Sequence, residues 1–261
     1  MITSSGNVQM KNLVKLQKNA RTRKEQQAFV IEGKKLFEEA KMYGKVKQAY
    51  VTPRYVEELS VPEEVYFAGI TYELVEEKVL KEVADTMSPQ GILAIVEKPE
   101  YQLSAFLNKS ELSLILLEDL RDPGNLGKIM RTAEGAGVDG VIMSKETVDL
   151  FNPKVVRSTM GSIFRMPFLY VDDFFGTVRQ LQEQDVNVVA TDLSGKRDYD
   201  RENYGRKTAI VIGNEAKGIS ASMREMADTL VKIPMAGKVE SLNASIAAGI
   251  MMYELFRQRR A

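Results

Sequence analysis

The feature that most constrains the fold is a pair of nearly continuous apolar segments in the second half of the chain. Residues 112–117 read LSLILL, and residues 208–213 read TAIVIG. Apolar segments of this length that do not alternate with polar residues are typical of strands buried on both faces of a parallel sheet. Helical and strand-like stretches alternate around them. The second half is therefore predicted to be an α/β fold, with a parallel sheet covered by helices on both faces.

The chain is long enough to form two domains, and its pattern changes near residue 100. It has 261 residues, of which 44% are hydrophobic, and this supports two cores of moderate size. Pro99 and the polar residues around it interrupt the alternation of helices and strands. We therefore expect a first α/β domain at residues 1–100, a linker at 101–110 and a second domain at 111–261.

Each domain has its own predicted set of elements. In the first domain the pattern predicts helices at 11–24, 34–43, 53–59 and 72–84, and strands at 28–33, 46–52, 65–68 and 91–97. In the second domain it predicts strands at 112–120, 138–144, 166–171, 186–192, 208–213 and 229–235, with helices at 125–135, 153–163, 174–184, 220–226 and 243–259.

Residues 135–140, Gly-Ala-Gly-Val-Asp-Gly, match the glycine pattern of dinucleotide-binding loops. That mechanism requires the glycines after a strand and at the start of a helix, where free amides meet a pyrophosphate. Here the glycines end a predicted helix and precede a predicted strand. We therefore interpret Gly135 or Gly137 as a helix C-cap, and a nicotinamide-dependent enzyme is disfavoured.

The composition excludes several kinds of chemistry. The chain contains no cysteine and no histidine, which excludes disulfides, zinc sites built on those ligands and acid–base catalysis by imidazole. We expect no metal. The first residues lack the apolar stretch of a secretory signal, and no apolar run is long enough to span a bilayer. A cytoplasmic protein without a membrane partner is expected.

Charge is balanced over the whole chain but polarised at its beginning. Residues 1–47 contain 11 basic and 4 acidic residues, whereas residues 48–100 contain 4 basic and 11 acidic ones. A basic segment of this kind can neutralise RNA phosphates and release counterions, although a solvated helix face would have the same composition. The basic residues expected to bind RNA are Lys11, Lys15, Lys18, Arg21, Arg23 and Lys24.

Three loops at the ends of predicted strands gather small and polar residues, and this is where open α/β sheets bind their ligands. The first is 121–127, which leads into a helix that carries Arg131. The second is 212–218, and the third is 233–237 followed by 241–245. Helix caps and solvated turns are alternative structural explanations for parts of each loop. Capping by Asn125, Ser241 or Asn243 is the simplest of these explanations.

Three motifs follow one another in these loops. They are Asn125-x-Gly127-x-x-x-Arg131, Gly213-Asn214-Glu215-x-x-Gly218, and Ile233-Pro234-Met235 with Ser241-Leu242-Asn243-x-Ser245. Together they resemble the motifs of the SpoU/TrmH group of the SPOUT superfamily, whose members are RNA ribose 2'-O-methyltransferases. The resemblance covers residues 112–261. Residues 1–100 more loosely resemble the L30e-like substrate-binding domain of the rRNA-directed members.

The resemblance implies a fold, a cofactor and an assembly. It implies a SPOUT domain with a deep trefoil knot, S-adenosylmethionine as the methyl donor, an RNA substrate and a homodimer. The implied catalytic residues are Asn125, Arg131, Glu215, Ser241 and Asn243. The implied cofactor-binding residues are Thr191, Asp192, Gly213, Asn214, Gly218, Ile233, Met235 and Leu242. Lys128 departs from the small or apolar residue that is more usual at its place, and a phosphate contact is expected for it.

The expected reaction moves a methyl group from S-adenosylmethionine to a ribose 2'-hydroxyl, most simply in 23S rRNA. Because a guanidinium keeps its proton, we expect Arg131 to stabilise the developing alkoxide and to orient a phosphate. Glu215 would orient Arg131 or Asn125. The alternatives are a tRNA 2'-O-methyltransferase and a non-catalytic RNA-binding or ribosome-assembly protein with the same fold.

Overall fold

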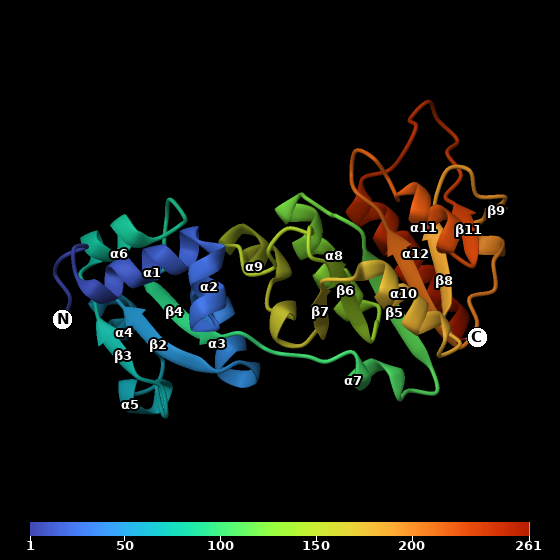
Figure 1. Cartoon of the computed structure of the whole chain (residues 1–261). Helices are drawn as coiled ribbons and strands as arrows, with labels where there is room; N and C mark the ends of the chain where they lie inside the picture. The colour runs from blue at the N-terminus through green and yellow to red at the C-terminus, as the bar shows by residue number, and fades with distance from the viewer. Residues whose placement is uncertain (261) are drawn as a thin grey trace. The chain divides into compact units, whose positions relative to one another are not determined.

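The computed structural model describes residues 1–260, which divide into two compact units with separate sheets (Figure 1). Unit 1 contains residues 1–99 together with residues 149–164, and unit 2 contains residues 100–148 and the chain from residue 165 onward. This division differs from the contiguous domains expected from the sequence. Residues 149–164 belong to the first unit, although they lie between two strands of the second.

Unit 1 is built on a four-stranded sheet with the strand order β1-β4-β2-β3. The central strand β4 (Ile92–Glu97) is antiparallel to β1 (Ala28–Glu32) and to β2 (Val46–Val51), and β3 (Tyr72–Leu74) is parallel to β2. The helices are α1 (Val8–Lys18), α2 (Ala20–Gln26), α3 (Lys34–Tyr43), α4 (Pro53–Glu57), α5 (Glu63–Tyr66), α6 (Glu77–Val83) and α9 (Pro153–Thr159).

Two of the elements predicted for unit 1 were wrong, and a third, predicted as one helix, consists of two helices. The strand expected at 65–68 overlaps helix α5, because Pro62 and the acidic residues after it favour a helix start. The helix expected over 72–84 begins with strand β3, and α6 follows it. The helix expected at 11–24 is broken at Asn19, whose side chain accepts hydrogen bonds from the first amides of α2.

Residues 149–164 help to form the core of unit 1. The ring of Phe29, a fully buried residue of β1, lies 4.9 Å from that of Phe151 and 6.0 Å from that of Phe164. Arg23 is only 3% exposed, and its guanidinium lies 2.6 Å from the carboxylate of Asp149. Since a buried charge needs a partner, this ion pair makes the segment a necessary part of the unit.

Unit 2 contains the predicted parallel sheet. Its seven strands are all parallel in the order β7-β6-β5-β10-β8-β11-β9. The strands are β5 (Leu112–Leu117), β6 (Gly140–Ser144), β7 (Phe168–Val171), β8 (Asn187–Thr191), β9 (Arg197–Asp198), β10 (Lys207–Ile212) and β11 (Thr229–Lys232). The helices are α7 (Ser104–Leu107), α8 (Pro123–Gly135), α10 (Phe174–Gln182), α11 (Ala221–Met226) and α12 (Ala244–Arg260).

Helices cover both faces of this sheet. Leu112, Leu114 and Leu116 of β5 share one core with α7, α10 and α11. Successive strand residues point to opposite faces, and α8 and α12 pack together and against strands of the sheet. All six residues of β5 are buried, which confirms the predicted α/β class and the prediction that this strand is buried on both faces.

Two further expectations concern short segments of unit 2. The linker expected at 101–110 contains α7, whose Phe106 is buried in the core of the unit against Gly140. Gly137 takes the left-handed conformation, with φ of +67°, just after α8 ends. The predicted helix C-cap is therefore confirmed at this position. Within residues 1–260, every helix is too short or too polar to cross a membrane.

Candidate active site at the carboxyl edge of the parallel sheet

The loops singled out in the sequence leave one edge of the unit 2 sheet. β10 pairs in parallel with β5 on one side and with β8 on the other, and β8 pairs with β11. The carboxyl ends of parallel strands lie at the same edge of a sheet, so the loops that follow these four strands begin next to one another. The sequence therefore brings the three motifs together through strand order.

The loop after β10 is held in a tight turn. Asn214 and Gly218 exchange backbone hydrogen bonds of 3.0 and 2.8 Å, and Gly218 has φ of +68°. A Cβ at Gly213 would overlap the backbone of Gly218, so only glycine fits there. The side chain of Asn214 accepts from the amides of Ala216 and Lys217 and donates to the carbonyl of Asp119. Asn214 therefore shapes the loop through its side chain.

Glu215, in the same turn, holds the loop that precedes α8. Its carboxylate accepts hydrogen bonds from the amides of Arg121 at 3.0 Å and Asp122 at 2.9 Å, and from Asn125 Nδ2 at 3.0 Å. Burial favours the neutral form and would raise the pKa of Glu215, but these hydrogen bonds outweigh it and lower the pKa below its ordinary value. An ionised carboxylate with three donors is suited to positioning other groups.

Asn125 has a different role from the helix cap considered in the sequence. The N-cap of α8 is Asp122, whose side chain accepts from the amide of Asn125 at 2.8 Å. The side chain of Asn125 is thereby free for other contacts, and the residue is 4% exposed. Its Nδ2 donates to Glu215 and its Oδ1 accepts from Asn243 Nδ2 at 3.0 Å. Asn125 thus joins all three loops.

Asn243 extends this chain of hydrogen bonds into helix α12. Its Oδ1 accepts from the amide of Ser245 at 2.9 Å and from Ser245 Oγ at 2.6 Å. Asn243 is therefore a helix cap and a member of the site at once. The hydroxyl of Ser245 donates to Asn243, Asn243 to Asn125, and Asn125 to Glu215, which fixes the orientation of both amides.

Two of the expected catalytic residues lie apart from this chain of hydrogen bonds. Arg131 and Ser241 are exposed and take no part in it. Six helical residues turn the chain through about 600°, so Arg131 lies about 120° around α8 from Asn125. Of the two residues that Glu215 was expected to orient, Asn125 is hydrogen-bonded to its carboxylate. Arg131 instead lies beside Lys128 on the exposed face of α8.

The sequence assigned no role to two residues of the site. Asp122 caps α8, and Ser245 is buried and donates to Asn243. Their spacing in the sequence is that of helix caps, in which an Asp or Asn accepts from the amide two or three residues later. Asp122 accepts from the amide of Asn125, and Asn243 accepts from the amide of Ser245. The sequence left open which of the neighbouring polar residues would be the cap.

The residues expected to hold the cofactor line the same edge but differ in their contacts. Thr191 Oγ1 donates to the carbonyl of Val211 at 3.2 Å. The carboxylate of Asp192 is bound by Arg224 at 2.9 Å and by Ser194. Burial would raise the pKa of Asp192, but these two partners lower it overall. The paired Asp192 side chain is therefore a structural anchor for the loop after β8.

The segment after β11 can accept a ligand through its backbone. Ile233, Met235 and Leu242 are half-buried there. Across the described chain, no residue accepts a hydrogen bond from the amides of residues 235–242. Apolar side chains beside free backbone donors suit a ligand with a flat apolar ring and polar edges. The residues present therefore fit S-adenosylmethionine.

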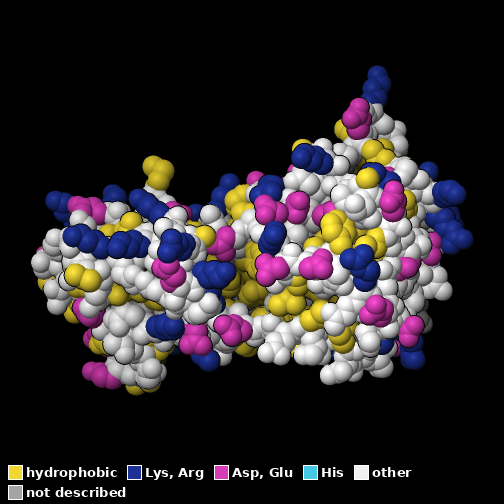
Figure 2. Space-filling view, in the orientation of Figure 1, with side chains coloured by type: hydrophobic (Ala, Val, Ile, Leu, Met, Phe, Trp, Pro, Cys, Tyr) yellow, Lys and Arg dark blue, Asp and Glu magenta, His cyan; other side chains and the backbone are white. Residues whose placement is uncertain are grey.

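The basic residues of unit 1 divide into exposed ones and one that is buried. Lys11, Lys15 and Lys18 are exposed on α1 at a spacing that places them on one face, and dark blue side chains follow α1 and α2 in Figure 2. Arg21 and Lys24 are also exposed. Arg23 was wrongly expected to bind RNA, because its guanidinium is buried against Asp149 and the carbonyls of α1.

Two family models match the chain, one for each half. The SpoU rRNA Methylase family matches residues 113–253. The MRM3-like substrate binding domain matches residues 7–94. The first match covers all three motif loops.

Known proteins match over nearly the whole length. The 23S rRNA (guanosine(2553)-2'-O)-methyltransferase RlmP of Bacillus subtilis is 33% identical, and the match covers 97% of this chain and 98% of RlmP. The SpoU methyltransferase AviRb from Streptomyces viridochromogenes, solved in complex with AdoMet, has a TM-score of 0.88 at 26% identity, covering 98% of this chain and 99% of AviRb. An AdoMet-bound rRNA methyltransferase from Sinorhizobium meliloti has a TM-score of 0.84 at 34% identity, covering 98% of this chain and 97% of that one. The chain belongs to the SpoU rRNA methylase family.

Proposed function

We propose that this chain transfers a methyl group from S-adenosylmethionine to a ribose 2'-hydroxyl of 23S rRNA. The observation that carries the proposal is the chain of hydrogen bonds from Ser245 through Asn243 and Asn125 to Glu215. It joins the three motif loops of a SpoU methylase domain in one place. RlmP, whose name assigns it this reaction on 23S rRNA, matches both units of the chain.

The cofactor site proposed here is the edge formed by the loops after β8, β10 and β11. S-adenosylmethionine supplies a methyl group already activated by a positively charged sulfur. Ile233, Met235 and Leu242 would contact its apolar parts, and the backbone around Gly213 and Gly218 would approach it closely. Thr191 would close the edge of the pocket. Asn214 and Asp192 would shape the loops, since their side chains are engaged by the protein.

The acceptor side of the reaction needs a group that stabilises negative charge on the ribose oxygen. Arg131 would do this as a permanent cation, and it would orient an RNA phosphate. Asn125, held by Glu215, and Asn243, which donates to Asn125, would fix the loops around the ribose. Ser241, exposed beside Asn243, would contact the RNA. Positioning of the reacting oxygen and the methyl group then provides most of the rate enhancement.

Unit 1 would bind the RNA. The exposed cations of α1 and α2 form a surface for phosphates, which gives affinity without sequence readout. Lys128 on α8 would add a phosphate contact. The match of residues 7–94 to a substrate binding domain supports this role. Residues 1–100 would form this domain together with residues 149–164, which complete its core.

The functional form would be a homodimer in the cytoplasm. Helix α12 exposes Ile246, which is 54% exposed, and Tyr253, which is 51% exposed. These residues are seven apart and lie on one face of the helix, as in the seam of packed helices. A second copy of the chain would cover them. The family resemblance further predicts a deep trefoil knot beside the cofactor site.

Mapping of ribose methylation tests the proposed function. Large-subunit rRNA from cells with and without the gene would be compared by mass spectrometry. One 2'-O-methylated nucleotide should be lost with the gene and restored by the purified protein with S-adenosylmethionine. A methyl group on a base, or a methylated tRNA with unchanged rRNA, would contradict the proposal.

A further inference from the structure

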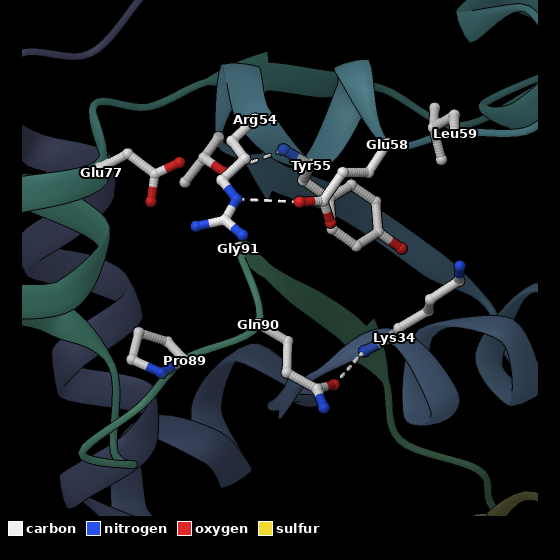
Figure 3. Close-up of a pocket in the computed structure, with 10 residues that line it drawn as sticks. Lys34, Arg54, Tyr55, Glu58, Leu59, Glu77, Pro89, Gln90 and Gly91 are labelled. Atoms are coloured by element: carbon white, nitrogen blue, oxygen red, sulfur yellow. Dashed lines mark hydrogen bonds and ion pairs between the residues drawn. The ribbon is translucent and has the colours of Figure 1, made fainter.

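Unit 1 contains a cavity that the proposed chemistry does not use. Its volume is about 380 Å³, which lies in the range of sites for small molecules, roughly 300–1,000 Å³. The lining comes from the start of α3, from α4, from the start of α6 and from the segment before β4 (Figure 3). The cavity is thus formed within the unit that matches a substrate binding domain.

Two glycines in the left-handed region shape the backbone beside this cavity. Gly91 lines the cavity with φ of +78°, and a Cβ there would lie 2.7 Å from Thr52 Oγ1. Gly33 has φ of +99°, and a Cβ there would lie 2.8 Å from Gln90 Oε1. The amide of Lys34 donates to that same oxygen at 3.0 Å. The orientation of the Gln90 side chain is thereby fixed, and its Nε2 remains as a donor.

Hydrogen-bond donors and acceptors lie next to one another in the cavity. Arg54 Nε donates to Glu58 Oε1 at 2.8 Å, which leaves the terminal nitrogens of the guanidinium and the second carboxylate oxygen for a ligand. Figure 3 shows the Arg54 guanidinium between the carboxylates of Glu58 and Glu77. Tyr55, Leu59 and Pro89 add apolar surface.

This combination selects a class of ligand. A phosphate alone would meet the carboxylates of Glu58 and Glu77. A wholly apolar molecule would use none of the hydrogen-bonding groups that the exposed side chains of Arg54 and Glu58 present. The edge of a nucleobase has donors beside acceptors, and proteins read RNA sequence mainly from such edges in unpaired bases. Guanine fits best, because its O6 and N7 accept from a guanidinium, while its N1–H and amino group can donate to a carboxylate.

We infer that the cavity binds one unpaired guanine of the substrate RNA, which Arg54, Glu58 and Gln90 contact through hydrogen bonds. The inference rests on the proposed function, because it assumes that unit 1 binds RNA. It adds sequence selectivity to a unit whose exposed lysines contact phosphates of any sequence.

Binding of two hairpin RNAs by the full chain tests the inference. Both hairpins contain the same guanine, and the second has one added cytosine that pairs with it. Fluorescence anisotropy gives both Kd values at one salt concentration. The first should bind about tenfold more tightly, as one good base contact provides. Arg54→Ala and Glu58→Ala should each reduce this preference to about twofold or less.

Matched variants separate this contact from general electrostatics. Glu57 is exposed, adjoins Glu58 and lies outside the lining of the cavity. Glu57→Ala changes the net charge as Glu58→Ala does. It should nevertheless keep the roughly tenfold preference for the hairpin with the unpaired guanine. Arg21 pairs with Glu25 at 2.7 Å on α2, four residues apart like Arg54 and Glu58. Arg21→Ala should weaken both hairpins by the same factor.

The possible outcomes distinguish the two proposals. Equal affinity for both hairpins, or a preference kept by both Arg54→Ala and Glu58→Ala, overturns the guanine site while methyl transfer continues. Tighter binding of free guanosine monophosphate than of the unpaired hairpin also overturns it, because the site would then serve a mononucleotide. Absence of methyl transfer to any rRNA overturns the proposed function itself.

Discussion

Asn125 shows how a single buried amide can organise a site at the residue scale. Its oxygen and its nitrogen both have partners, one from the loop before α12 and one from the loop after β10. A buried amide that loses one partner costs about 1–3 kcal/mol. The three loops therefore keep their relative positions through a small number of directed contacts. The reacting groups would be held in place before RNA binds.

The ionised form of Glu215 should contribute to stability down to acidic pH. Its pKa is lower in the folded chain than in the unfolded one, so the contribution is full above the unfolded pKa and is lost as the pH falls through the folded pKa. The difference in unfolding free energy between the original chain and Glu215→Gln should be constant from about pH 6 to 8. It should shrink only below about pH 4. Urea unfolding at several pH values measures it, and a difference that shrinks between pH 8 and 6 would argue against this hydrogen-bonded carboxylate.

Arg131→Ala should reduce methyl transfer by about 10²–10³-fold, while S-adenosylmethionine binding stays within about twofold. The cation is proposed to act on the RNA side, and loss of such a group typically costs about 10²–10³ in kcat. Lys128 is its neighbour on the exposed face of α8. Lys128→Ala removes the same charge and should raise KM for RNA with little change in kcat. Single-turnover kinetics with calorimetry of the cofactor separates these effects, and equal loss of kcat in both variants would refute the special role of Arg131.

At the scale of elements, α1 should carry much of the salt-dependent RNA affinity. Lys11, Lys15 and Lys18 lie on one exposed face of this helix. Changing all three to Gln should lower the slope of log affinity against log salt by about 2–3, since each phosphate contact contributes about 0.7–0.9. RNA titrations at several salt concentrations measure the slope. An unchanged slope would assign these lysines to a solvated face that RNA does not touch.

The positions of the strands were easier to predict in unit 2 than in unit 1, for a physical reason. β5 and β10 are buried on both faces, so their apolar runs are unmistakable in the sequence. β3 has three residues, all half-buried, and so carries no clear alternation. The run at 65–68 is apolar because Tyr66 and Phe67 pack against Phe37. Tyr66 is the last residue of the short helix α5, and Phe67 lies in the turn after it. Short apolar runs do not distinguish helix from strand.

The candidate site was predictable in its residues and less so in its contacts. The motifs located Asn125, Glu215 and Asn243 correctly in one place. The sequence alone left the partner of Glu215 open, because that depends on which face of α8 points inward. Arg23 was misassigned for a similar reason: its burial depends on Asp149, which lies 126 positions away in the chain.

At the scale of the whole molecule, the fold of unit 1 depends on a segment that lies between β6 and β7 of unit 2. Phe151→Ala should lower the free energy of unfolding of unit 1 by about 3–5 kcal/mol, because Phe151 is 4% exposed and packs on Phe29. Hydrogen exchange should then become faster in β1, more than a hundred residues away in sequence. Phe174→Ala is the matched control, since Phe174 is buried in the core of unit 2. Unchanged exchange in β1 after Phe151→Ala would contradict this dependence.

The chemical position of the transferred methyl group distinguishes ribose methylation from every alternative reaction. Purified protein would be incubated with rRNA and S-adenosylmethionine labelled in its methyl group, and the RNA would then be hydrolysed in alkali. Alkali cleaves a phosphodiester through the neighbouring 2'-hydroxyl, so a 2'-O-methylated ribose protects its own linkage. We expect the label in an alkali-resistant dinucleotide. Label released in mononucleotides, or no label in the RNA, would contradict it.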